Sequence, residues 1–188
     1  NDGTTPLYMA CQNNHLECAR LLLEVGAAPD QAMNDGTTPL FMACQNGRLE
    51  CARLLLEANA AIDQADDEGT TPLSAASFNG QLECVRLLLE AGAAVNQADA
   101  EGRTPLYAAC LNGHLESARL LLETGAAVNQ ANEEGATPLF IACQQGQIEC
   151  VRLLLEASAA TDQAAQGGAT PLFIASQQGQ VECARLLL

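Results

Sequence analysis

Basic and aromatic residues are scarce in this 188-residue chain. It has no Lys and no Trp, eight Arg stand against 23 acidic residues for a formal net charge of −15, and aromatic residues make up only 3%. Nucleic-acid backbones and anionic membrane surfaces bind positive charge, so we expect neither as a partner. The sequence also lacks a signal-peptide pattern and any apolar run near the roughly 18 residues of a membrane span.

The chain holds little of what catalysis or metal binding requires. Its only two His are His15 and His114, and no Ser/His/Asp or Cys/His catalytic group can be assembled around them. It has no Gly-rich loop of the kind that cradles phosphate. Structural zinc needs a full tetrahedral set of converging thiolate or imidazole ligands, which the spacing of Cys and His does not provide. We therefore predict no catalytic, cofactor-binding or metal-binding residues, and no enzyme activity.

What the sequence does contain is a strict repeat. Thr-Pro-Leu recurs every 33 residues, which divides the chain into units 1–33, 34–66, 67–99, 100–132, 133–165 and a partial unit 166–188. A constant period of this length indicates units that pack only on their neighbours. We expect a single array over residues 1–188. Because the last unit stops in mid-pattern, we interpret the array as a fragment of a longer array or protein.

Each unit predicts a helix, a tight turn, a second helix and an extended loop, here called the finger. In the first unit, Thr5 is a typical N-cap and Pro6 suits the first helical position, where its missing N–H is not needed. The second helix carries its Leu residues on one face and Glu17, Arg20 and Glu24 on the other. We interpret these charged residues as a solvated outer face, where such pairs contribute about 0.2–0.5 kcal/mol each.

These features resemble the ankyrin-repeat family, in the G-x-T-P-L motif, the Gly between the helices and the L-L-L-E-x-G-A-A segment. The resemblance covers all six units and implies an all-α repeat solenoid, with stacked helix-turn-helix repeats and β-hairpin or loop fingers. It also implies a concave face of fingers and first helices that binds a protein or peptide. The His that the family usually carries after Thr-Pro-Leu is replaced, so we expect packing of aromatic side chains between repeats at five of the six positions: Tyr8, Phe41, Tyr107, Phe140 and Phe173.

The nine Cys occupy only two positions of the repeat, one on each helix, and Ser takes the same positions elsewhere. Exchange between Cys and Ser indicates a need for a small side chain, and free Cys packs as a small hydrophobe. We predict buried, reduced thiols. A reducing compartment follows, so we expect an intracellular protein, cytoplasmic or nuclear.

The positions at which the repeats differ are the candidates for contact with a partner. The finger tips are acidic in five units, which favours a basic partner, although the same charge also serves to keep a Leu-rich solenoid in solution. Phe78 and Leu111 interrupt a row of amides along the first helices; Phe78 is either an interface anchor or a cover for the gap left by Ser74. The candidate partner-binding residues are Phe78, Leu111, Asp35, Gln45, Asp67, Glu68, Asn79, Glu101, Arg103, Asn112, Glu133, Glu134 and Gln144.

Two functions are compatible with this pattern. The first is a monomeric protein–protein interaction module that binds a partner protein or peptide on the finger and first-helix face. The second is an engineered or selected scaffold of the same fold with no natural partner.

Overall fold

Helices and loops account for all of the chain that the computed structural model describes, residues 2–188, and no strand occurs among them. The chain divides into two units, Asn1–Ala94 and Val95–Leu188, here called unit 1 and unit 2. Unit 1 contains α1 (Pro6–Gln12), α2 (Leu16–Glu24), α3 (Pro39–Gln45), α4 (Leu49–Glu57), α5 (Pro72–Phe78) and α6 (Leu82–Glu90). Unit 2 contains α7 (Pro105–Leu111), α8 (Leu115–Glu123), α9 (Pro138–Gln145), α10 (Ile148–Glu156), the 3-10 turn η1 (Gln166–Gly168), α11 (Pro171–Gln177) and α12 (Val181–Leu187).

Each first helix begins at its Thr-Pro pair, as the sequence predicts. The Thr5 hydroxyl accepts from the amide of Tyr8 at 3.1 Å, and the Thr104 hydroxyl accepts from the amide of Tyr107 at 3.2 Å. The same cap occurs at the start of all six first helices in the described chain. These caps satisfy an amide that the short helices leave without an intrahelical acceptor.

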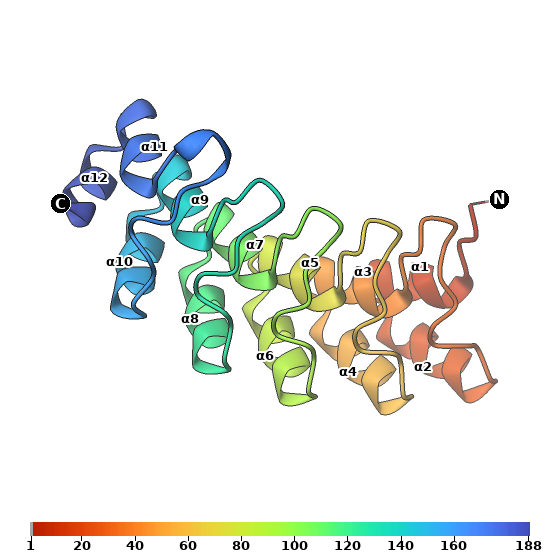
Figure 1. Ribbon diagram of the computed structural model, residues 1–188. Helices are drawn as coiled ribbons and strands as arrows, with labels where there is room; N and C mark the ends of the chain where they lie inside the picture. Colours follow the sequence, from red (N-terminus) through yellow and green to blue (C-terminus); the bar gives the residue numbers. More distant parts are fainter. Residues whose placement is uncertain (1) are drawn as a thin grey trace. The chain divides into compact units, whose positions relative to one another are not determined.

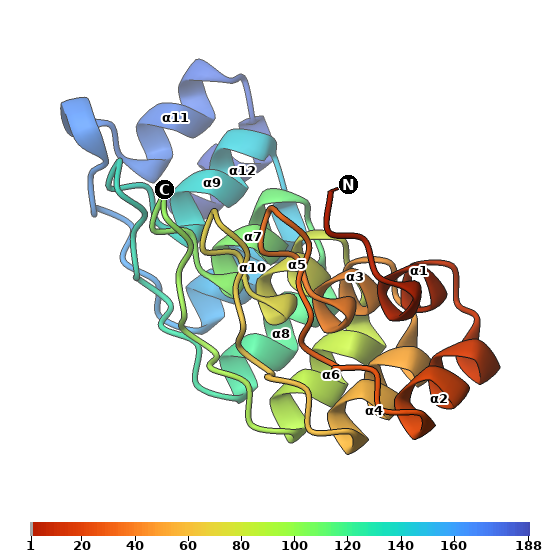
Figure 2. The same cartoon turned by 90° about the vertical axis from the view of Figure 1, so that its right-hand side faces the viewer.

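The helices of each unit form two layers (Figure 1). In unit 1, α3 packs against both α1 and α5, and α4 packs in a second row against α2 and α6. Figure 2 shows these two rows from the side, with the fingers running past them. Unit 2 repeats the pattern, with α9 between α7 and α11, and α10 between α8 and α12. The predicted solenoid of stacked helix pairs is therefore confirmed within each unit.

The second helices bury Leu and expose paired charges. Leu121 of α8 and Leu154 of α10 are fully buried. On the outer side, Arg119 lies 3.9 Å from Glu116 and Arg152 lies 3.7 Å from Glu149. The predicted solvated face is confirmed, and each of these glutamates has its counter-charge on the same helix.

The fingers are loops closed by hydrogen-bonded turns. In unit 1 the amide of Met33 donates to the carbonyl of Thr37 at 2.9 Å, across the finger tip. Successive fingers are joined by single backbone bonds: the amide of Asp67 donates to the carbonyl of Asp35 at 2.9 Å, and in unit 2 the amide of Glu133 donates to the carbonyl of Glu101 at 2.9 Å. These bonds hold neighbouring finger tips in register beside the first helices.

The cysteine prediction is correct for eight of the nine thiols and wrong for Cys18. All nine are free, and all but Cys18 are buried. The Cys11 thiol is packed against Cys51 of the following repeat, and burial raises the pKa of Cys11 to about 12. Cys51 is covered by Cys11, which lies on the first helix of the preceding repeat. Cys18, on α2, has no such cover among the described residues, and its side chain is exposed.

Candidate partner-binding site

Part of the acidic charge at the finger tips has a structural role. The Asp35 carboxylate accepts from the Thr37 amide at 3.0 Å and from the Thr37 hydroxyl at 2.6 Å. The hydroxyl bond, followed by the amide bond, lowers the pKa of Asp35 below its usual value. Asp35 therefore closes its own turn while it contributes negative charge to the finger.

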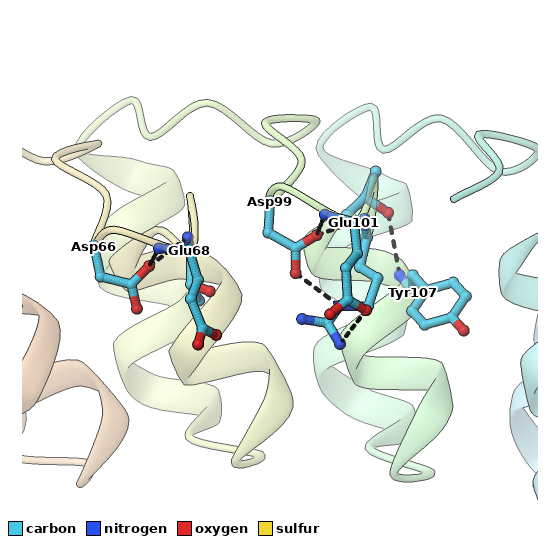
Figure 3. A network of polar contacts seen from close by, with 8 residues as sticks. Asp66, Glu68, Asp99, Glu101 and Tyr107 are labelled. Carbon is cyan, nitrogen blue, oxygen red and sulfur yellow. Dashed lines mark hydrogen bonds and ion pairs between the residues drawn. The ribbon is translucent and has the colours of Figure 1, made fainter. Parts of the chain in front are cut away.

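In unit 2 the same task falls to Asp99, which also holds the one Arg found in a described finger (Figure 3). Asp99 accepts from the amides of Glu101 and Arg103 at 3.0 and 2.9 Å, and from Arg103 Nε at 2.7 Å. Arg103 Nη1 lies 2.9 Å from the carboxylate of Glu101. Because both bonds occupy its guanidinium, Arg103 is held by its own finger and does not neutralise the next one.

A hollow of about 230 Å³ lies between this finger and the following one. It brings together five of the predicted site residues, which are Glu101, Arg103, Leu111, Glu133 and Glu134, with Tyr107 and Asn132 completing the wall. The Asn132 side chain accepts from the amides of Glu134 and Ala136 at 3.1 and 2.8 Å, which positions the second finger tip. We call this space the first hollow.

A second hollow of about 210 Å³ follows one repeat further along unit 2. Its wall contains the predicted Gln144, together with residues that sequence reasoning did not select: Tyr107, Ala136, Phe140, Ala165 and Gln166. Glu134 belongs to both hollows, as does Tyr107. These two residues therefore form the partition between the hollows.

The sequence position of Tyr107 predicts packing between repeats, and in the structure Tyr107 also lines both hollows. Its side chain is only 7% exposed. Burial raises the pKa of Tyr107, an effect that the positive charge of Arg103 opposes and the carboxylate of Glu134 reinforces. In Figure 3 its hydroxyl points away from Asp99 and Glu101.

The remaining predicted residues are dispersed. In unit 1, Asp67 and Glu68 are exposed at a finger tip, Gln45 is half-buried at the end of α3, and Phe78 is 47% exposed. Asn79 caps α5, with its side-chain amide donating to the carbonyl of Ala75 at 2.8 Å. In unit 2, Asn112 follows α7 and is exposed. The roles of these residues in partner binding stay predictions.

Among residues 2–188, no three His, Cys, Asp or Glu side chains come together in a group that would hold a metal ion. No helix in the same range has both the length and the apolar character needed to cross a membrane.

Comparison with known proteins gives one result. A family model described as ankyrin repeats (3 copies) matches residues 1–66, 58–132 and 124–188. A search of curated proteins finds no match. Ankyrin repeats are generally protein–protein interaction modules, and proteins built from them are typically not enzymes. With the repeats, the capped helix pairs and the finger turns described above, this match shows that the chain belongs to the ankyrin-repeat family.

Proposed function

We propose that this chain binds a partner protein or peptide on the face formed by its fingers and first helices, called the partner face. The observation that carries the proposal is the pair of hollows in unit 2, since both are lined by side chains from fingers and first helices. Clefts of this kind, with polar groups converging on an aromatic wall, are where proteins take ligands. In this proposal the chain binds and does not catalyse.

The distribution of charge favours this face and a basic partner. On the outer face, Glu116 and Glu149 have Arg partners on their own helices. Within the described residues, Glu133 and Glu134 form no ion pair. Uncompensated charge steers an oppositely charged partner to the surface that carries it. Nucleic acid, with a charge of the same sign as these carboxylates, does not fit.

The free thiols support an intracellular location for this function. Eight cysteines are buried without a disulfide, and the exposed Cys18 is also free. Proteins of oxidising compartments seldom retain so many reduced thiols. We propose that the six repeats act as one array and that the chain is a monomer, because each repeat buries its apolar face against its neighbours.

The test is affinity capture with the intact chain, followed by titration of the captured partner in purified form. The first variant is Glu133→Arg/Glu134→Arg on the partner face. Its matched control is Glu123→Arg/Glu156→Arg, which makes the same change in net charge at two exposed positions that end α8 and α10. We expect the first variant to weaken binding by at least roughly tenfold, as loss of close charge pairs does, and the control to leave it almost unchanged.

Equal losses in the two variants would show a bulk charge effect and contradict the proposed face. If the chain captures no partner that survives purification, the second function, a scaffold without a natural partner, is the better description.

A further inference from the structure

The two tyrosines of the chain occupy the same position of the repeat but differ in their surroundings. The Tyr8 phenol has the polar side chain of Thr37 beside it, which acts to lower the pKa of Tyr8 against the larger raising effect of burial. The residue that corresponds to Thr37 one repeat after Tyr107 is Ala136, which offers no polar side-chain atom. The hydroxyl of Tyr107 accordingly has no hydrogen-bonding partner among the described residues.

Tyr107 lines both hollows, and its hydroxyl points away from the Asp99 and Glu101 side of the first one (Figure 3). The Tyr107 side chain is more than nine-tenths buried, at 7% exposed, and it lines both spaces. Among the described residues, Ser77 Oγ is the side-chain oxygen that is both fully buried and without a partner. The Tyr107 oxygen also lacks a partner, but it is not fully buried. An unpartnered hydroxyl at the wall of a cavity is a group that a ligand donor would satisfy.

The carboxylates around Tyr107 define the charge of that ligand. Glu134 lines both hollows and Glu133 the first, and neither forms an ion pair within residues 2–188. Arg103, the basic residue nearest to them in the hollow wall, is already bonded to Asp99 and Glu101. Carboxylates beside an aromatic ring form a site for a cationic side chain, which binds the ring face and the carboxylate together.

The spacing of the hollows defines how such side chains are arranged. The two spaces are one repeat apart, and packed helices lie about 8–10 Å from each other. A polyproline II peptide advances about 3.1 Å per residue with three residues per turn, so its side chains at i and i+3 point the same way about 9 Å apart. An extended peptide of this kind matches the spacing of the two hollows.

We propose that the hollows on either side of Tyr107 accept two basic side chains, three residues apart, from an extended segment of a partner protein. The Glu134 carboxylate and the Tyr107 hydroxyl bind the side chain in the second hollow, with Phe140 as its apolar wall, and Glu133 binds the side chain in the first. This inference rests on the proposed function, because it names the ligand that the partner face would take.

The test uses fluorescently labelled peptides and the intact chain, with binding followed by anisotropy at two salt concentrations. The probe peptide has the core Arg-Pro-Pro-Arg, and its control has the core Arg-Pro-Arg-Pro, with the same length and charge. We expect the probe to bind roughly tenfold more tightly than the control, the difference made by one hydrogen bond to a charged group. Equal affinities would overturn the proposal, as would the absence of any binding.

Two variants separate the groups that are proposed to act. Glu134→Gln should lower the affinity for the probe peptide by roughly tenfold. Glu123→Gln, the same change at an exposed position of α8, should leave that affinity unchanged. Tyr107→Phe keeps the ring and removes the hydroxyl; since Phe41 and Phe140 stand at the same repeat position, this variant should retain the melting temperature of the parent chain. We expect weaker probe binding in Tyr107→Phe, and unchanged affinity would remove the hydroxyl from the site.

A purified partner distinguishes the two proposals. If the partner loses affinity for Glu133→Arg/Glu134→Arg but is not displaced by an excess of the Arg-Pro-Pro-Arg peptide, the partner face is correct and the dibasic ligand is wrong. If neither change affects the partner, the partner face itself is wrong.

Discussion

Replacement of Gly113 by Ala tests how neighbouring repeats are coupled in unit 2. Gly113 follows α7 with a φ of +72°. A Cβ at this position would overlap Oε1 of Gln147 from the next repeat and lie 2.7 Å from its Cδ. The Gln147 side chain reaches this point to donate to the carbonyl of Leu111 at 3.4 Å. An alanine therefore strains the backbone and displaces a side chain that joins two repeats.

The expected destabilisation has two parts. A residue other than Gly in the left-handed region destabilises the folded chain by about 1–2 kcal/mol. Ala also lowers the conformational entropy of the unfolded chain, which offsets about 0.4–1 kcal/mol of this cost. The net backbone part is therefore about 1 kcal/mol. Rotation of Gln147 away from the new methyl group gives up its bond to Leu111, which adds about 1 kcal/mol. Gly113→Ala should thus lower the free energy of unfolding by about 2 kcal/mol in total.

The assay is urea-induced unfolding of the parent chain, Gly113→Ala, Gln147→Ala and the double variant. In the Gln147→Ala background, the Gly113 substitution should cost only the backbone part, about 1 kcal/mol, so the coupling between the two sites should be about 1 kcal/mol. Gly179 is the matched control, because it occupies the same repeat position with a φ of +70° and would place its Cβ within 4 Å of nothing. Gly179→Ala should show the backbone cost alone. A coupling indistinguishable from zero would refute the contact with Gln147 as a source of stability.

Ser158 follows α10 with a φ of +61°, at a repeat position that Gly92 and Gly125 occupy elsewhere. In a thermal melt, Ser158→Gly should be more stable than the parent chain by about 0.5–1 kcal/mol, and a lower melting temperature would contradict backbone strain at Ser158. Under native conditions a maleimide should modify one thiol rapidly, and mass spectrometry should locate it at Cys18; rapid modification of a second thiol would contradict the burial of the other eight. Because the pKa of Asp35 is lowered in the folded chain, its contribution to stability is present above the unfolded-state pKa of about 3.9 and is lost as the pH falls through the folded-state pKa. The melting temperature of Asp35→Ala should therefore fall less than that of the parent chain between neutral and strongly acidic pH.

Local structure could be read from the sequence because its causes lie within a few residues. The cap that Thr104 provides involves an amide three positions later, and the same arrangement is written six times along the chain. The exposed pairs of the outer face are equally local, as Glu116 and Arg119 show. Repetition then removes most of the ambiguity of a single short segment, since every copy must adopt a compatible structure.

The candidate site was predicted in part. The acidic finger tips and Leu111 were identified because they vary between repeats, and the structure gathers Glu101, Glu133 and Glu134 with Leu111 at one hollow. Tyr107 was not predicted to line the hollows, because the aromatic residues at its repeat position were expected to pack between repeats. Phe173, at 56% exposed, departs from that expectation. The available signal was a comparison between repeats: Thr37 follows Tyr8 by one repeat, whereas Ala136 takes the equivalent place after Tyr107.

The sequence by itself determined the repeat unit, the two helices in it, their caps, the small buried positions of the cysteines and the sign of the charge on the fingers. Periodicity and short-range hydrogen bonding decide all of these. Only the tertiary structure decided that Cys18 is exposed, that the carboxylates of Asp35 and Asp99 are engaged within their own turns, and that Tyr107, whose hydroxyl has no partner among the described residues, lines two hollows. The bonds of Asp35 and Asp99 form inside one finger and depend on how that finger turns back on itself. The surroundings of Cys18 and Tyr107 depend instead on which side chain of a neighbouring repeat, about 30 residues away along the chain, is present to cover or bind each group.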